Sequence, residues 1–152
     1  MNFRPAFLVL ACISLNGCSY AYELLAVVRD GQLTFVVDPK SRQHPECIRQ
    51  IDVSSVKRRR LKAAQGEDRT KTGYGTFWSQ SINYDDGCAN KFPVAYGVVL
   101  AGQRQLDRGS VNAKPLVRGI EYEISTTTSA TGYGFGYFMI DASGRVINLP
   151  QG

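Results

Sequence analysis

The chain has 152 residues, of which 18 are basic and 13 acidic, so its formal net charge is +5 with its one histidine neutral. This length suits one domain of ordinary size with its own core and excludes a second domain. A single histidine offers little material for a catalytic triad, and the sequence holds neither a Gly-x-Ser-x-Gly segment nor a phosphate-binding glycine loop. We therefore expect a protein that is not an enzyme.

Residues 1–17 have the features of a signal peptide. Arg4 supplies a positive charge near the start, and an apolar segment from Ala6 to Leu15 follows it. This segment is too short for a membrane-spanning helix, which needs roughly 20 apolar residues. We therefore predict an exported protein from which residues 1–17 are removed.

The segment Leu15-Asn16-Gly17-Cys18 resembles the lipobox of bacterial lipoproteins, in which an aliphatic residue and a small residue precede the cysteine that receives the lipid. A thiol suits this role because it is a strong nucleophile at neutral pH. Asn16 departs from the lipobox, which usually has a smaller or apolar residue there. The resemblance implies lipid attachment at Cys18 and a membrane-anchored lipoprotein facing the periplasm or the cell exterior.

A strand-like sequence begins near Tyr22, so residues 18–21 would form a tether of at most roughly 15 Å between the lipid and the domain. Cleavage after Ala21 is the alternative, because Ser19 and Ala21 also suit an ordinary signal peptidase. That cleavage would release a soluble periplasmic protein beginning at Tyr22.

Residues 22–152 consist of short runs of β-branched and aromatic residues separated by turn residues, a pattern typical of an antiparallel all-β domain. Asp30-Gly31 readily forms a type I′ turn and predicts a hairpin between the first two runs. We expect an antiparallel β-sandwich, with a small β-barrel as the alternative. The predicted strands are 22–29, 32–38, 47–53, 76–84, 94–101, 117–128, 134–141 and 145–149.

Residues 54–71 interrupt the strand pattern with a basic run, in which Ser54 or Ser55 is a candidate cap for a short helix near 54–64. The run is either a solvated surface or a site that binds anionic lipid head groups or an acidic envelope polymer. We exclude nucleic acid as a partner, because no recognition motif accompanies the run and an exported protein rarely meets nucleic acid. Its members are Lys57, Arg58, Arg59, Arg60 and Lys62.

Cys47 and Cys88 are the two cysteines that remain in the body of the exported chain, and they predict a disulfide bond. If they were reduced, the two thiols with His44 and the neighbouring Asp85 and Asp86 would offer ligands that suit zinc. This set is the basis of an alternative function, a metal-dependent periplasmic enzyme. Because a disulfide consumes both thiols, we expect no metal site and no cofactor.

The segment Thr72-Gly73-Tyr74-Gly75 recurs at 131–134, and aromatic residues follow both copies. We interpret these glycines as sites of close packing, some covered by a neighbouring ring. A carbohydrate-binding module is an alternative, since exposed rings can stack on sugars. Its candidate platform is Tyr74, Trp78, Tyr133 and Tyr137.

These observations favour a non-enzymatic lipoprotein of the cell envelope. Its β-domain would be anchored in the membrane through the lipid and would bind a protein or polymer partner at the membrane surface. Burial of the aromatic rings would argue against the carbohydrate-binding alternative.

Overall fold

The computed structural model describes residues 19–82, 87–102, 109–128 and 131–151. The predicted signal peptide and Cys18 lie outside the described residues, as do Asp85 and Asp86. The elements are β1 (Tyr20–Arg29), β2 (Gln32–Val37), β3 (Gln50–Ser55), α1 (Arg69–Gly73), β4 (Thr76–Ser81), β5 (Val94–Ala95), β6 (Glu121–Thr127), β7 (Gly132–Ile140) and β8 (Val146–Leu149).

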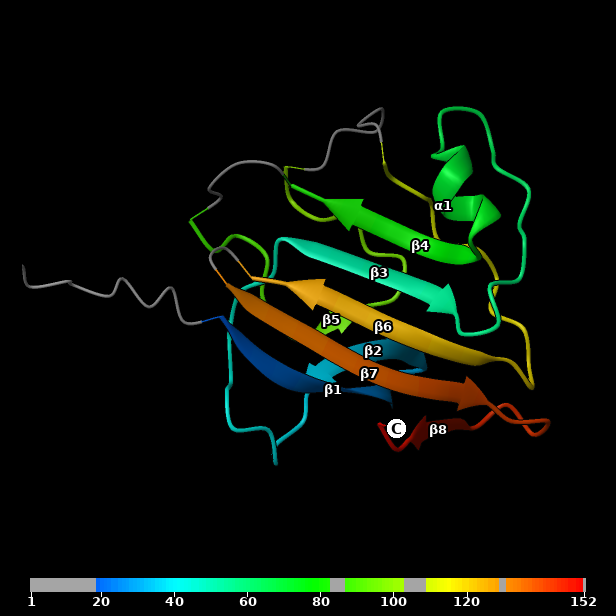
Figure 1. Cartoon of the computed structure of the whole chain (residues 1–152). Coiled ribbons are helices and arrows are strands. Elements are labelled where there is room, and N and C mark those ends of the chain that lie inside the picture. Colours follow the sequence, from blue (N-terminus) through cyan, green and yellow to red (C-terminus); the bar gives the residue numbers. More distant parts are fainter. Residues whose placement is uncertain (1–18, 83–86, 103–108, 129–130, 152) are drawn as a thin grey trace, which may run out of the picture.

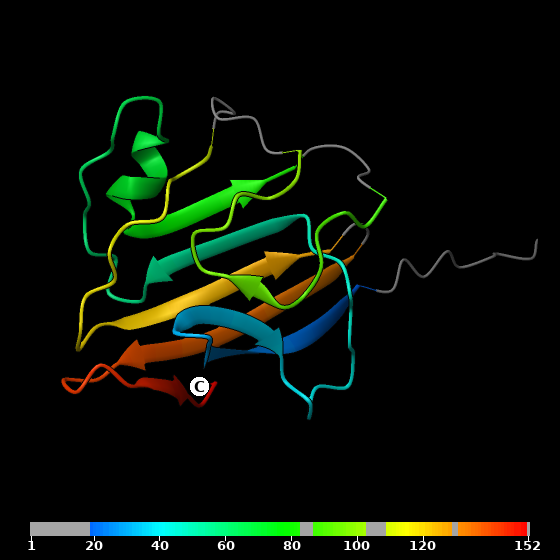
Figure 2. The ribbon, with the colours of Figure 1, turned by 180° about the vertical axis from the view of Figure 1, so that it is seen from behind.

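The strands form one eight-stranded sheet in the order β4-β3-β6-β7-β1-β2-β5, and β8 pairs with β7. The sheet curls into a half-barrel, and β2 and β5 lie across its inner face (Figure 1, Figure 2). The all-β prediction is therefore confirmed. The sheet is mixed rather than purely antiparallel, because β1 and β7 pair in parallel.

The first hairpin forms where it was predicted. Asp30 and Gly31 both have positive φ angles, 50° and 76°, as a type I′ turn requires. They join β1 to β2, which pair antiparallel from Arg29 with Gln32 to Leu24 with Val37.

The curl of the sheet arises in β1, which changes partner along its length. Tyr20–Glu23 pair with β7, whereas the strand pairs with β2 from Leu24 onward. Where β1 no longer pairs with β7, the side chain of Asn148 in β8 forms the hydrogen bonds with the β1 backbone that a neighbouring strand would otherwise form. Its side-chain Oδ1 accepts a hydrogen bond from the Ala26 N–H at 2.7 Å, and its Nδ2 donates to the Ala26 carbonyl at 2.9 Å.

Aromatic residues fill the inner face. Trp78 stacks with Phe35 at a centroid distance of 6.3 Å, and Tyr122 stacks with Phe138 at 5.2 Å. Phe77 is an extra residue at a register shift between β3 and β4, and both Phe77 and Trp78 belong to the buried core. A bulge of this kind can turn two successive side chains into one core.

Close packing at glycine, also predicted, is found where β1 meets β7. A Cβ built on Gly132 or Gly134 would overlap the rings of Tyr20 and Tyr22. The glycines therefore give the rings room to lie over β7.

The disulfide between Cys47 and Cys88 is present, with the two Cα atoms 5.2 Å apart. It joins the segment before β3 to the segment after β4, which are 41 residues apart in the sequence. Lys91 pairs with Cys47 as an isolated bridge beside the disulfide.

The short helix lies at Arg69–Gly73 and not within 54–64. Ser54 and Ser55 are the last residues of β3, because pairing with β6 continues as far as Ser55. The helix cap is Asp68, whose Oδ1 accepts hydrogen bonds from the backbone N–H groups of Thr70 and Lys71. Among the described residues, no helix has the length and hydropathy that crossing a membrane requires.

Candidate functional site

The direction of the strands separates two ends of the sheet. β1, β3 and β7 run the same way, since β3 and β7 are each antiparallel to β6 and β1 is parallel to β7. Tyr20, Gln50 and Gly132, where these strands begin, therefore lie at one end, here called the Tyr20 end (Figure 1). Ser55, the last residue of β3, lies at the other, the Ser55 end, roughly 20 Å away for six extended residues.

The predicted basic run follows β3 at the Ser55 end. Residues 56–62, here called the basic loop, begin with a turn at 56–57, where Arg58 has a φ of 49°, and form neither helix nor strand. Leu61 is half-buried against the core, whereas the side chains of Lys57, Arg58, Arg59, Arg60 and Lys62 are all exposed.

Hydrogen bonds hold the basic loop in one conformation. The Ser55 carbonyl accepts a hydrogen bond from the Arg58 N–H at 2.9 Å, and the Ser55 hydroxyl accepts one from the Arg59 N–H at 2.8 Å. Further along, the Leu61 N–H donates to the Thr72 carbonyl of α1 at 3.0 Å. Ser55 and Thr72 thus fix the loop at both ends.

The close approach of the basic loop explains why one of the recurring glycines, Gly75, has no side chain. Its φ is +89°, and a Cβ there would lie 2.6 Å from the Ser55 hydroxyl oxygen and 2.8 Å from the Arg59 backbone nitrogen. A side chain at this position would push the basic loop away from α1. The first copy of the repeated segment therefore serves the loop, whereas the second serves the packing of β1 on β7.

Two acidic residues near the basic loop are engaged elsewhere, whereas Glu121 lines a hollow together with Lys57 and Arg59. Asp52 pairs with Lys71 at 3.1 Å, and Glu67 pairs with Lys114 at 2.7 Å. Burial raises the pKa of the Glu67 carboxyl, but hydrogen bonds from Lys114 and from two backbone N–H groups outweigh burial and lower it below its ordinary value. In the part of the chain that the structure describes, no basic side chain of the loop has an ion-pair partner within 4.0 Å.

Two of the surface hollows beside the loop are lined by its basic side chains. The hollow of about 320 Å³ between the loop and α1 is lined by Arg60, Leu61, Arg69, Thr70, Gly73 and Tyr74. The hollow of about 250 Å³ beside β6 is lined by Ser55, Lys57, Arg59, Gly119, Ile120 and Glu121. Basic side chains of the loop thus line both hollows.

The four predicted stacking residues do not form one platform. Trp78 is 0% exposed, so its ring is buried in the core and cannot contact a ligand. Its inward orientation coincides with the extra residue in β4. Tyr74 follows α1 and remains 59% exposed, with the Arg58 guanidinium 5.7 Å from the centre of its ring. Tyr133 and Tyr137 lie on the outer face of β7.

Phe135, which was not among the predicted residues, lies between these two tyrosines on the outer face of β7. Tyr133 and Phe135 are exposed, and Tyr137 is partly exposed. Polar residues of β6 stand opposite the three rings: Thr127, Ser125 and Glu123. The signal in the sequence was the alternation of glycine with aromatic residues from 132 to 137, which places the rings on one face.

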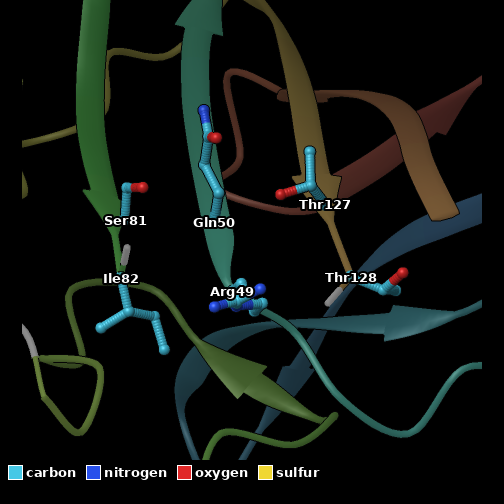
Figure 3. Close-up of a pocket in the computed structure, with 6 residues that line it drawn as sticks. All are labelled: Arg49, Gln50, Ser81, Ile82, Thr127 and Thr128. Atoms are coloured by element: carbon cyan, nitrogen blue, oxygen red, sulfur yellow. The ribbon is translucent and has the colours of Figure 1, made fainter. Parts of the chain in front are cut away.

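A third hollow, of about 270 Å³, lies at the Tyr20 end (Figure 3). It is lined by Arg49, Gln50, Ser81, Ile82, Thr127 and Thr128. The side chain of Gln50 is oriented by the hydrogen bond that its Nε2 donates to the Asp52 carboxylate at 2.6 Å. One guanidinium group beside three hydroxyl groups suits a small polar ligand, and sequence analysis did not select these residues.

The alternative metal site has no thiol ligands, because both of its cysteines form the disulfide. Cys47 and Cys88 are bonded to each other, and His44 is exposed in the loop before them. Among the residues described, no cluster of three or more histidine, cysteine or acidic side chains is arranged to hold a metal ion.

Comparison of the chain with protein-family models, with curated proteins and with solved structures finds no match. Its function is therefore inferred from its own residues.

Proposed function

We propose that this protein is a non-enzymatic lipoprotein of the bacterial cell envelope that is anchored through Cys18 and binds an anionic polymer or protein partner with its basic loop. The observation that carries the proposal is the position of the loop. It lies at the Ser55 end of the sheet, opposite the end where β1 begins two residues after Cys18.

The start of β1 supports processing at Cys18 rather than after Ala21. The Tyr20 N–H donates a hydrogen bond to the Thr131 carbonyl at 3.0 Å, and the Tyr20 ring packs on Gly132. Cleavage after Ala21 would remove both interactions, whereas cleavage before Cys18 leaves β1 whole. Ser19 alone would then separate the lipid cysteine from the sheet.

This short connection argues against the anchoring membrane as the ligand of the basic loop. The Tyr20 end would face the membrane, and the loop would stand roughly 20 Å further out. Attraction to the lipid head groups is screened over about 8 to 10 Å at physiological ionic strength. The loop is therefore directed toward a partner beyond the membrane surface, which favours the polymer or protein over the anionic lipid.

The electrostatics of the loop support binding to an anion. Each basic residue near an anionic surface contributes about 1 kcal/mol, and five such residues act together here. Because hydrogen bonds already hold the loop backbone, binding would cost little further backbone entropy, and the entropy cost would come from ordering the basic side chains.

The test uses the mature chain with Cys18→Ser, so that no lipid contributes to binding. Polyphosphate, polygalacturonate and anionic phospholipid vesicles are the probes. We expect salt-sensitive binding to at least one of the polymers, and we expect a Lys57→Gln, Arg58→Gln, Arg60→Gln triple variant to abolish it. The matched control is an Arg29→Gln, Lys40→Gln, Arg42→Gln variant, which removes the same charge from other exposed positions.

Equal weakening in the two triple variants would show that only net charge matters and would refute a site at the loop. Absence of binding to both polymers would refute the anionic polymer as the ligand and leave the protein partner. Vesicle binding that depends on the loop would restore the membrane as its ligand.

Neutral glycan binding is a second candidate function. It is favoured by the exposed row Tyr133, Phe135 and Tyr137, with the hydroxyl and carboxylate groups of β6 beside it. Rings supply stacking surfaces, and the polar groups of β6 can bond sugar hydroxyls. Retardation of the chain in gels that contain a neutral polysaccharide, relieved by Phe135→Ser, would support this function, and unretarded migration would eliminate it.

A further inference from the structure

We infer that the hollow between the basic loop and α1 is a subsite for one acidic sugar unit, so that the anionic partner is an acidic polysaccharide. The inference rests on the proposed function and narrows its ligand class. It depends on three features of the hollow: two guanidinium groups, an exposed aromatic ring and a wall fixed by hydrogen bonds.

The guanidinium groups come from separate elements. Arg60 belongs to the basic loop and Arg69 begins α1, and both line the hollow. Neither has a carboxylate within 4.0 Å in the described part of the chain. A guanidinium group binds a carboxylate through two parallel hydrogen bonds, so the pair can receive the acid group of a uronate.

The apolar part of the hollow distinguishes a sugar from a simple anion. Tyr74 and Leu61 line it together with the two arginines. An aromatic ring offers a flat surface to the C–H face of a sugar ring, and Thr70 supplies a hydroxyl for hydrogen bonding. A chain of phosphate groups would leave Tyr74 and Leu61 unused.

The walls of the hollow are also preorganised for a ligand. The Leu61 N–H bond to Thr72 holds the loop against α1, and Arg58 lies over the Tyr74 ring. Its volume of about 320 Å³ is at the lower end of the range of small-molecule sites, which suits one unit rather than a long segment.

The hollow is open to solvent, and a second hollow, whose lining includes Lys57 and Arg59 beside the single carboxylate of Glu121, lies on the other side of the loop. A polymer chain can therefore enter and leave the subsite and meet further positive charge as it crosses the loop. This arrangement suits an internal unit of a polysaccharide.

The experiment compares polygalacturonate, which has acidic sugar rings, with polyphosphate, which has charge without rings. The mature chain with Cys18→Ser is measured with Tyr74→Leu, Tyr74→Phe and Arg69→Gln, and Arg42→Gln serves as a charge control. We expect Tyr74→Leu to weaken binding to polygalacturonate about tenfold, as the loss of one aromatic contact would. Its effect on polyphosphate should stay below about twofold, and Tyr74→Phe should bind like the parent.

Arg69→Gln should weaken binding to polygalacturonate by about tenfold, the effect of losing one charge-assisted hydrogen bond, and by more than Arg42→Gln does. Thermal unfolding of each variant checks that the fold is retained.

Equal weakening of both polymers by Tyr74→Leu would show that the ring only positions Arg58, and loss of binding in Tyr74→Phe would assign the effect to the hydroxyl. Either result overturns the sugar subsite and leaves the anionic site of the proposed function standing. Binding to polyphosphate alone would do the same. Binding to neither polymer would overturn both the subsite and the polymer ligand of the proposed function.

Discussion

The ring of Tyr22 in β1 lies directly on Gly134 of β7, and its hydroxyl reaches Thr126 of β6 at 2.7 Å. Tyr22 thus spans a whole strand to contact the strand beyond it. This is possible because Gly134 has no side chain in the space that the ring occupies. The same relationship joins Tyr20 to Gly132, so two tyrosines attach the first strand to the sheet.

Gly134→Ala is expected to destabilise the domain. The added methyl group would overlap both the Tyr22 ring and the Thr126 hydroxyl, and overpacking of this kind costs about 1 to 3 kcal/mol. Urea unfolding of the mature chain measures the change in the free energy of unfolding. The control is Gly73→Ala, where a Cβ meets nothing within 4 Å. Equal stability of the two variants would contradict the packing described.

Asn148→Ala is expected to weaken the attachment of β1 where it leaves β7. The variant removes both side-chain hydrogen bonds to the Ala26 backbone, and each is worth about 0.5 to 1.5 kcal/mol. Hydrogen exchange should show faster exchange of the Ala26 amide than in the parent. Asn112→Ala is the control, since the hydrogen bond of this exposed residue is donated by its backbone N–H. Unaltered protection at Ala26 would show that Asn148 is not needed there.

Cys88→Ser is expected to lower the free energy of unfolding by about 2 to 4 kcal/mol, because the unfolded chain gains freedom when the 41-residue connection to Cys47 opens. Denaturant unfolding under non-reducing conditions measures the loss. In the parent, reduction should produce a similar change, whereas reduction should leave the variant unaffected. Free thiols at both positions in protein taken from the envelope would contradict the bond.

Stability is expected to fall between about pH 10 and pH 12. Burial raises the pKa of the Tyr22 hydroxyl to about 12 from its ordinary 10, although the hydrogen bond with Thr126 acts in the opposite direction. Between these values the unfolded state loses the proton while the folded state keeps it, so unfolding becomes more favourable as the pH rises. Burial also raises the pKa of Tyr96. Tyr22→Phe should therefore show a smaller loss of stability over this range, and an identical pH profile would contradict the assignment.

Processing at Cys18 is expected to yield a lipid-modified first residue. Mass spectrometry of the membrane-extracted protein should detect an N-terminal peptide that begins at acylated Cys18. An unmodified peptide beginning at Tyr22 would instead show cleavage after Ala21. A chain shortened to start at Tyr22 should be less stable than the mature chain, because it lacks the hydrogen bond between Tyr20 and Thr131 and the ring that covers Gly132.

Features that depend on neighbours in the sequence were predicted well. The turn at Asp30-Gly31 follows from the φ angles these residues adopt readily, and most strands follow from alternation of polar and apolar residues, although the predicted strand 94–101 is only Val94–Ala95. The disulfide followed from cysteine count and from the expectation of export. The helix was misplaced because Ser54 and Ser55 have the local properties of caps, whereas pairing with β6 keeps them extended.

The tertiary structure decided which side chains are available and where they lie. Trp78 and Tyr133 belong to similar aromatic segments, yet a bulge accompanies the burial of Trp78 in the core, and the alternation of β7 places Tyr133 outside. The basic run was evident in the sequence, but its distance from Tyr20 depends on the common direction of β1 and β3. Strand direction and pairing arise from contacts between residues far apart in the chain, which no local pattern of residues encodes.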